Sequence, residues 1–258
     1  MELPTPAGEG AGSLHRAAAL ADLRAGLKQG LLLGAALAAL VLPTARPMAH
    51  SGARLTAGVA LVPQRQVTHA VFAGTNPSPD ARELAEWVAF SGDNGGTPFA
   101  ILDKRAARLF VFDPDARLLS SSLVLLGSAV GDDSAPDIGD RPLAQLGSHE
   151  RTTAAGRFVS QPGRDDTGER VVWVDYASAL ALHRVKVVDP KERRFERIAT
   201  DSITDKRISN GCINVPIAFF DDVVEPALGR ARAVVYVLPE VKPLHQVFPR
   251  VAARPPAS

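Results

Sequence analysis

Cys212 is the only cysteine in 258 residues, and its neighbours suit a reactive thiol. The segment around it, residues 207–216, reads RISNGCINVP. A glycine directly before a nucleophile lets the backbone turn sharply and keeps that side clear for a substrate. The N–H groups of Asn210, Gly211 and Cys212 can point at one spot, as in an oxyanion hole built from backbone alone. An inert buried residue and an intermolecular link are the other interpretations of a single cysteine.

A thiol nucleophile needs a basic partner, and His183 is the best candidate. In the segment SALALHRV, which we expect to be a strand, His183 shares a face with Ala179, Ala181 and Val185. These small neighbours leave room for a substrate or for the thiol. A hydrogen-bonded histidine without a catalytic role is the alternative interpretation of His183. His149, in the predicted loop GSHERTTAAGRF, is the rival base.

Short apolar or alternating segments separated by turn residues predict six strands. Together with one helix before them, they indicate a mainly β fold, a sandwich or barrel with a few short helices, and not a βαβ array. The six segments are 98–104, 108–113, 117–130, 169–176, 178–188 and 232–240.

Two helix starts can be recognised from the sequence. Ser78 is a predicted N-cap, with Pro79 at the first helical position. Pro216 can begin a second helix over NVPIAFFDDVVEPAL. This places Cys212 at a predicted strand-to-helix junction. A helix N-terminus favours thiolate over thiol, so together with His183 it predicts a depressed pKa for Cys212.

The first part of the chain resembles an export signal. Residues 31–42 are twelve apolar residues or glycine, whereas a membrane-spanning helix needs about 20. Basic residues precede the run and small residues follow it, as in a signal peptide cleaved after Ala49 or Ala53. An uncleaved membrane anchor and a buried core helix are the alternatives. We therefore expect an exported protein, with membrane contact only through this segment if it is not cleaved.

Charge and composition exclude several classes of site. Without residues 1–49, 25 basic and 25 acidic residues remain, so no nucleic-acid-binding surface is expected. The histidines lack ligand spacing and no Gly-rich phosphate loop is present, so neither a metal nor a cofactor is expected. The predicted organisation is a leader over 1–53, a helix and linker over 54–97, a catalytic domain over 98–240 and a Pro-rich, weakly ordered tail over 241–258.

The segment RISNGCINV resembles the active-site signature of the L,D-transpeptidases, the YkuD-type peptidoglycan enzymes. That signature is a histidine on a strand, then Ser/Thr-x-Gly-Cys, an apolar residue and Asn or Arg. FAILDKRAARLFVFDPDARLL is similar to the opening hairpin of their domain, and RTTAAGRF to their Thr-Pro-x-Gly-x-Phe loop, with Ala154 in place of proline. The resemblance covers roughly residues 98–240. The matching residues are His183, Ser209, Gly211, Cys212, Ile213 and Asn214.

Three departures from this pattern concern the surroundings of the histidine. Asn210 stands where many members have a second histidine, and Arg184 stands where glycine or serine usually follows the strand histidine. The inserted segment VDPKERRFERIATDSITDK, residues 188–206, lengthens the gap between His183 and Cys212. These departures leave open what orients the imidazole and what covers the substrate cleft.

The resemblance implies a reaction on peptidoglycan stem peptides in the periplasm, or at the outer side of the inner membrane. Cys212 would attack the carbonyl at the L-centre of the third stem residue, release D-Ala and form a thioester. His183 would take the thiol proton and return one to the leaving amine. An amine of another stem, or of a protein, would then resolve the thioester.

The resemblance also suggests roles for the residues near Cys212. Arg207 or Arg184 would hold a substrate carboxylate, a solvated surface arginine being the alternative for each. Asn214 would brace the loop or contact the substrate. Ser209 would hold the turn or polarise the histidine side.

Two other functions fit the same residues. Water could resolve the acyl-enzyme, which would make the protein an L,D-carboxypeptidase or endopeptidase. Alternatively, Cys212 is inert and the domain only binds the cell wall. A binding module has no need of the Gly-Cys junction and the histidine together.

Overall fold

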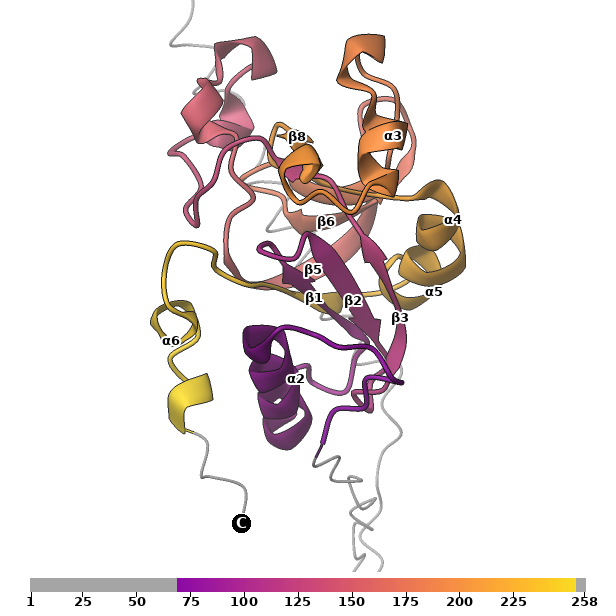
Figure 1. The fold of residues 1–258 in the computed structure, drawn as a ribbon, viewed down its shortest axis with the longest axis vertical. Coiled ribbons are helices and arrows are strands. Elements are labelled where there is room, and N and C mark those ends of the chain that lie inside the picture. Colours follow the sequence, from indigo (N-terminus) through magenta and orange to yellow (C-terminus); the bar gives the residue numbers. More distant parts are fainter. Residues whose placement is uncertain (1–68, 254–258) are drawn as a thin grey trace, which may run out of the picture. The chain divides into compact units, whose positions relative to one another are not determined.

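The strands form an eight-stranded sheet and a separate two-stranded sheet within residues 69–253, the part of the chain that the computed structural model describes (Figure 1). The predicted leader, residues 1–53, lies outside this part. Among the described residues, no helix combines the length and the apolar character needed to cross a bilayer.

The large sheet has the strand order β3-β2-β1-β10-β5-β6-β7-β9, and β4 pairs with β8. The strands are β1 (Phe99–Asp103), β2 (Arg108–Phe112), β3 (Leu118–Leu123), β4 (Leu126–Gly127), β5 (Gly156–Arg164), β6 (Arg170–Asp175), β7 (Leu180–Arg184), β8 (Arg207–Ser209), β9 (Ile213–Val215) and β10 (Ala233–Val237). The helices are α2 (Pro79–Ser91), α3 (Arg194–Ala199), α4 (Ile217–Phe219), the π-helical turn η6 (Phe220–Val224), α5 (Glu225–Leu228) and α6 (Leu244–Val247). The 3-10 turns are η1 (Ile138–Asp140), η2 (Leu143–Gln145), η3 (Ser148–Glu150), η4 (Pro190–Glu192), η5 (Thr204–Lys206) and η7 (Val251–Ala253).

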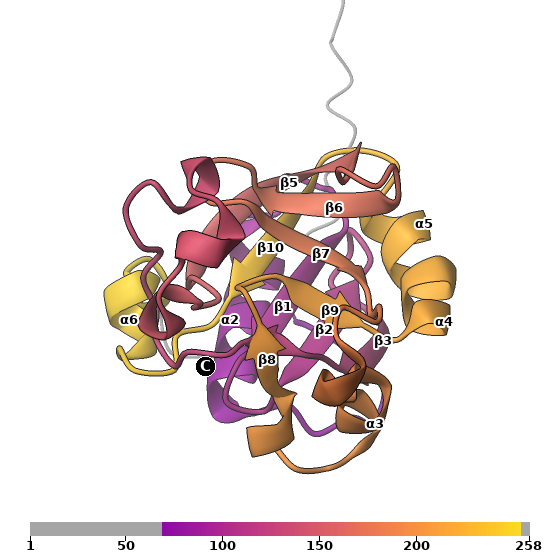
Figure 2. The same cartoon turned by 90° about the horizontal axis from the view of Figure 1, so that it is seen from above.

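The two edges of the large sheet are joined by the residue pair Leu125 and Asn214. Leu125 follows edge strand β3, and Asn214 lies on β9 at the other edge. The N–H of each donates to the carbonyl of the other at 2.9 Å. The sheet is therefore nearly closed, as the view from above shows (Figure 2). The predicted mainly β fold with a few short helices is confirmed.

Strand β1 is buried on both faces because it separates two apolar clusters. Ala100 and Leu102 face the inside of the curved sheet, whereas Phe99 and Ile101 pack on its other face with helix α2. The predicted start of α2 is confirmed, since Ser78 Oγ accepts a hydrogen bond from the Ala81 N–H at 3.2 Å. Helix α2 and the sheet therefore share one apolar cluster on this outer face.

The segment after residue 240 is not the loose tail that its prolines predict. Helix α6 brings Leu244 to the cluster around α2, and Phe248 and Val251 join it there, all three buried. Pro243 directly precedes this helix and Pro249 follows it, so neither interrupts the packed segment. Residues 254–258 lie outside the described part of the chain.

Candidate active site

Strands β7 and β9 place Cys212 and His183 on one face of the sheet. The two strands are parallel, with Leu182 opposite Ile213 and His183 opposite Asn214. Leu182 and Ile213 point into the inner core. Because side chains alternate along a strand, His183 and Asn214 face the other way. Cys212 comes two residues before Asn214 and therefore faces the same side as Asn214. The strand spacing puts the Cα atoms of Cys212 and His183 about 8 Å apart.

His183 is held as a neutral imidazole with a defined tautomer. Its Nδ1 lies 2.7 Å from the carbonyl oxygen of Arg184. A carbonyl only accepts, so Nδ1 carries the proton and Nε2 keeps its lone pair. Burial lowers the pKa of His183 below its ordinary value of 6.5. The ring can therefore take a proton at Nε2.

Asn214 connects the histidine to the Gly-Cys turn. Its side chain is fully buried, and Arg194 Nη1 donates to its Oδ1 at 3.0 Å. Because a guanidinium only donates, this contact fixes which way the amide points. Asn214 Nδ2 then lies 3.4 Å from His183 Nε2 and 3.3 Å from the Cys212 carbonyl oxygen. Asn214 is therefore the residue that faces the reactive nitrogen of His183.

Ser209 and Gly211 shape the turn before the cysteine. Ser209 Oγ accepts from the Gly211 N–H at 3.1 Å and donates to the Cys212 carbonyl at 2.6 Å. Gly211 has φ +130°, and a Cβ there would lie 3.0 Å from the Thr152 carbonyl oxygen. Ser209 thus holds the turn, one of its two expected roles. The Gly211 N–H is already bonded, which leaves the N–H groups of Asn210 and Cys212 as the candidate oxyanion donors.

A second hydroxyl supports the turn from the loop RTTAAGRF. Thr153 is fully buried, and its Oγ1 donates to the Gly211 carbonyl at 2.7 Å. The same oxygen accepts from the Gly127 N–H at 2.9 Å, on the short strand β4. The loop therefore ties β4 to the Gly-Cys turn, a contact that the sequence did not reveal.

The expected strand-to-helix junction at Cys212 is wrong, and so is the expected depressed pKa. Cys212 lies between strands β8 and β9, and helix α4 begins only at Ile217. The half-buried thiol is close to β7, with Sγ 3.5 Å from the Ala179 carbonyl oxygen. Burial raises the pKa of Cys212, against smaller effects of the Ala181 N–H and nearby cations. The free site therefore holds an uncharged thiol and a neutral imidazole.

The structure does not support Arg184 as a ligand for a substrate carboxylate. By strand alternation it faces away from His183. Its Nε donates to Asp221 Oδ1 at 2.7 Å, and its guanidinium lies 4.3 Å from the centre of the Phe220 ring. Arg184 thus fastens β7 to the helical segment after the site.

Arg207 is likewise committed to other partners. Its guanidinium pairs with the carboxylate of Glu240, with Nη1 3.2 Å from Oε1, and donates to the Lys104 carbonyl at 3.2 Å. Lys104 is itself fully buried and bonds Asp132 at 2.8 Å. Arg207 therefore belongs to a buried ionic cluster that links the β1–β2 turn to the end of β10.

The rival base His149 is an exposed residue of η3. Its ring lies next to Gly147 in its own loop, 2.8 Å from where a Cβ on that glycine would be. His183, in contrast, reaches the turn through Asn214. The arrangement favours His183 as the partner of Cys212.

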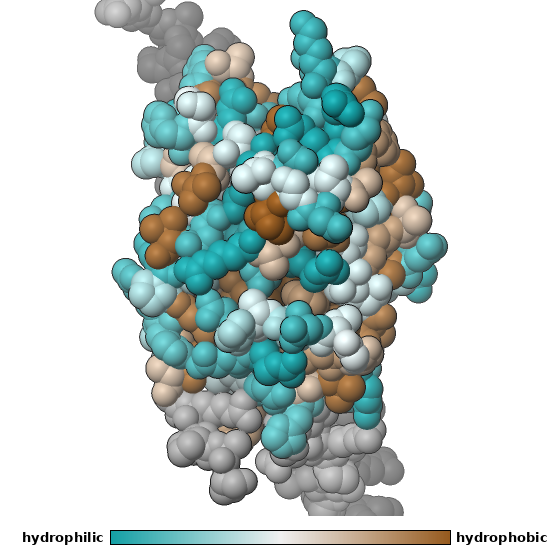
Figure 3. Space-filling model, in the orientation of Figure 1, coloured by the Kyte–Doolittle hydropathy of each residue, from teal (hydrophilic) through white to brown (hydrophobic). Residues whose placement is uncertain are grey.

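The inserted segment contributes helix α3, which the sequence analysis missed. Its Ile198 packs with Leu125 and Val185 on the face that carries the site, and polar side chains gather over α3 (Figure 3). Asp189 and Pro190 mark only the turn η4 that precedes α3, since Asp189 Oδ1 accepts from the Lys191 N–H at 2.9 Å as an N-cap does. Helix α3 itself begins after Arg193 without a side-chain cap. No feature of the sequence predicts the contact between Arg194 and Asn214.

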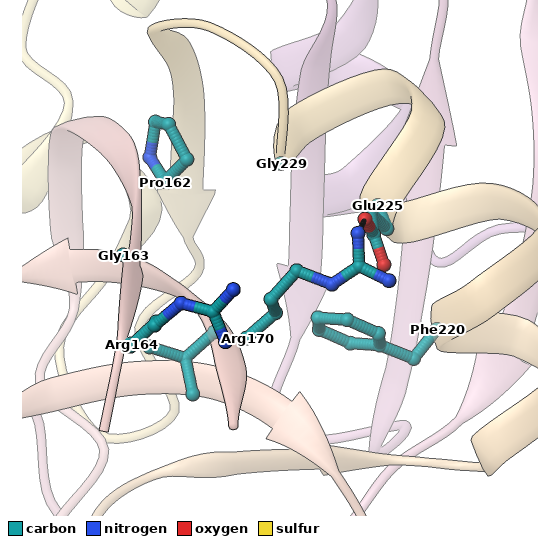
Figure 4. Close-up of a pocket in the computed structure, with 8 residues that line it drawn as sticks. Pro162, Gly163, Arg164, Arg170, Phe220, Glu225 and Gly229 are labelled. Atoms are coloured by element: carbon teal, nitrogen blue, oxygen red, sulfur yellow. Dashed lines mark ion pairs between the residues drawn. The ribbon is translucent and has the colours of Figure 1, made fainter. Parts of the chain in front are cut away.

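A cavity of about 270 Å³ opens elsewhere, between the β5–β6 hairpin and α5 (Figure 4). Arg170 crosses it to pair with Glu225 beside the Phe220 ring. None of the candidate catalytic residues lines this cavity, so it is not the place where Cys212 would meet a substrate.

The similarity found between this chain and known proteins is to solved structures. No family model and no curated protein matches the chain. Among solved structures, the chain is similar to one described as the "NMR structure of the catalytic domain from E. faecium L,D- transpeptidase". The two share 14% sequence identity with a TM-score of 0.32, over 55% of this chain and 98% of that chain.

Proposed function

We propose that the protein is a cysteine acyltransferase of the L,D-transpeptidase type, acting on peptidoglycan stem tetrapeptides. The observation that carries the proposal is the pairing of β7 with β9. This pairing sets Cys212 and His183, whose Nε2 carries no proton, on one face of the sheet, next to a turn that requires glycine. The sequence signature Ser-x-Gly-Cys-x-Asn supports the same assignment.

In the proposed first half-reaction, Cys212 attacks the carbonyl carbon at the L-centre of the third stem residue. The thiol proton passes to His183 Nε2, and the Arg184 carbonyl stabilises the imidazolium through Nδ1–H. The tetrahedral intermediate collapses, the proton moves to the leaving amine, and D-Ala departs. A thioester on Cys212 remains.

The position of Asn214 favours rapid return of that proton. Its Nδ2 faces His183 Nε2 at 3.4 Å, a long contact between a donor and a lone pair. Once Nε2 is protonated, two donors face each other, and burial also disfavours the charged ring. Both effects make the imidazolium a stronger acid towards the leaving amine.

In the second half-reaction an amine attacks the thioester carbon, and His183 removes the proton of that amine. The amide bond forms, and the proton passes from His183 to the thiolate of Cys212. We propose an amine of a second stem, or of a protein, as the acceptor. Water in its place would give the free acid.

The proposed substrate lies outside the cytoplasmic membrane, so we also propose export by the segment 1–53. A reporter that is active only in the cytoplasm, fused after residue 100, is expected to be silent. An active reporter would contradict export and leave the assignment of the substrate without support.

The proposed function is tested by intact-protein mass spectrometry after incubation with a defined tetrapeptide. We expect an adduct on Cys212 and release of D-Ala, and no adduct on Cys212→Ala. Comparing products with and without an added amine separates transfer from hydrolysis. A folded protein that gains no adduct, or gains it at another residue, would contradict the proposal.

A further inference from the structure

We propose that Arg194, supplied by the inserted helix α3, is a positioning residue that fixes the amide of Asn214 and thereby keeps His183 Nε2 free to act as the base. This inference deepens the proposed function, on which its kinetic test rests. The Arg184 carbonyl orients His183 and Ser209 holds the turn at Cys212, whereas the group that orients the Asn214 amide comes from the segment 188–206.

The guanidinium of Arg194 is held on two sides. The residue is only 7% exposed, Nε donates to Glu192 Oε2 at 2.6 Å, and Nη1 donates to Asn214 Oδ1 at 3.0 Å. A buried charged side chain that is both paired and hydrogen-bonded keeps a single conformation. Any other conformation of Arg194 would leave an N–H of its guanidinium without an acceptor. Arg194 therefore presents a fixed donor to Asn214.

Helix α3, although short, is fastened at its C-terminal end. The fully buried Lys206 donates to the carbonyl oxygens of Arg197 at 2.6 Å and Ile198 at 3.0 Å, and also to that of Thr200. These are the carbonyls that a helix end leaves without partners. Lys206 thus stabilises the helix that carries Arg194.

The orientation of the Asn214 amide decides which nitrogen of His183 holds the proton. With Arg194 in place, the amide NH2 of Asn214 faces Nε2. Because an NH2 group only donates, it can pair only with an Nε2 that carries no proton. Without that donor, the amide can turn so that Oδ1 faces Nε2. An acceptor there stabilises Nε2–H, and hence the imidazolium, so the base would already be protonated.

The charge of Arg194 itself also favours the neutral form of His183. Burial is the main cause of the lowered pKa of His183, and the positive charges of Lys186 and Arg194 lower it further, whereas the hydrogen bond to the Arg184 carbonyl and the charge of Asp165 raise it. Cys212, the proposed nucleophile, is an uncharged thiol in the free site. Loss of Arg194 therefore raises the pKa of His183 both by removing a cation and by freeing the amide.

The direct test is an NMR pH titration of the histidine ring nitrogens in the full 15N-labelled protein, with His183→Gln to assign the signal. At pH 7 we expect a neutral ring protonated at Nδ1. In Arg194→Met we expect the proton to move towards Nε2 and the pKa to rise by about one unit. The matched control is Arg193→Met, whose side chain is 71% exposed and 3.9 Å from Glu196; it should leave the signal unchanged.

Two further variants keep the test decisive if Arg194→Met does not fold. Arg194→Lys keeps the charge and one donor, so we expect a smaller shift. Asn214→Asp places an acceptor towards Nε2 while keeping the contact with Arg194, so we expect a raised pKa. An unchanged tautomer and pKa in folded Arg194→Met, or in Asn214→Asp, would overturn the inference.

The kinetic test follows adduct formation on Cys212 against pH. Arg194→Met should be slowed several-fold at pH 6 and less at pH 8, because a base whose pKa is raised by about one unit is freed at higher pH. An equal loss at every pH would indicate disruption alone and overturn the inference. If the wild-type protein forms no adduct while the NMR shift is observed, the positioning role stands and the proposed function falls.

Discussion

Asn214 and His183 face one another across parallel strands, with Nδ2 of the first 3.4 Å from Nε2 of the second. The contact presents a donor to the nitrogen that we propose as the base. It therefore disfavours the thiolate–imidazolium pair that many cysteine enzymes form before their substrate arrives. In this site, the proton is expected to move only when the substrate is in place.

The first prediction concerns the reactivity of the free thiol. Burial raises the pKa of Cys212 above its ordinary value of 9.0, so iodoacetamide should modify it more slowly at pH 7 than it modifies a small free thiol. The rate should still be rising at pH 9. Intact-mass measurement at several pH values checks this, with urea-unfolded protein as the control. Faster modification of the folded protein would show that the thiolate is stabilised after all.

The second prediction concerns Gly211. In Gly211→Ala, the Cβ would lie 3.0 Å from the Thr152 carbonyl oxygen at φ +130°, which should cost about 1–3 kcal/mol and displace the turn. Adduct formation on Cys212 should fall more than tenfold, a barrier change of about 1.4 kcal/mol. Gly168→Ala is the control, because Gly168 has φ +85° but no atom within 4 Å of the added Cβ. It should lose some stability and keep the adduct rate, and equal rates in the two variants would contradict the role of Gly211.

The third prediction concerns the buried ionic cluster. Lys104→Met would leave Asp132 and Glu240 without the amine that lies 2.8 Å and 3.5 Å from them. Breaking a buried pair from one side should lower the free energy of unfolding by about 3–5 kcal/mol. The neighbouring Arg105→Met removes a more exposed pair, 3.4 Å from Asp80, and should cost about 1 kcal/mol or less. Urea unfolding measures both, and similar losses would contradict the assigned difference.

The fourth prediction concerns stability in acid. Burial alone would raise the pKa of Asp132, but hydrogen bonds from Lys104 and from the backbone N–H groups of residues 240–242 lower it from 3.8 to about 2. A lowered pKa stabilises the fold above pH 3.8, and this contribution is lost as the pH falls through about 2. It should amount to about 2 kcal/mol.

Urea unfolding at pH 4.5 and pH 2 tests this value. The wild-type protein should lose more stability between the two than Asp132→Asn, in which residue 132 does not titrate. Asp166→Asn, at an exposed position, is the control and should behave as the wild type. Equal losses in the wild type and Asp132→Asn would rule out Asp132 as the source.

The parts of the fold that depend on local pattern could be predicted from the sequence. Alternation along SALALHRV placed His183 on the correct face, and Ser78 with Pro79 marked the start of α2. Strand β5 was missed because its sequence GRFVSQPGR contains glycines and a proline. Its first half pairs with β10 and its second half with β6, so Pro162 has a neighbour on one side only.

The wrong roles expected for the two arginines come from contacts between distant segments. The sequence offered Arg184 and Arg207 as free cations, but each finds its carboxylate on another element, Asp221 and Glu240. In the same way, the group that orients the site lies in the insertion that seemed only to interrupt it. Charge pairing over such distances leaves no periodic signal in a single sequence.

The position of β10 in the middle of the sheet has a consequence for how the chain folds. β10 lies between β1 and β5, and its register joins Phe99 to Val234. The sheet therefore cannot be completed until residues 233–237 have been synthesised, and closing so large a loop makes folding slow. Until then, β1 and β5 each expose an unpaired edge, which is where a partly made chain would aggregate.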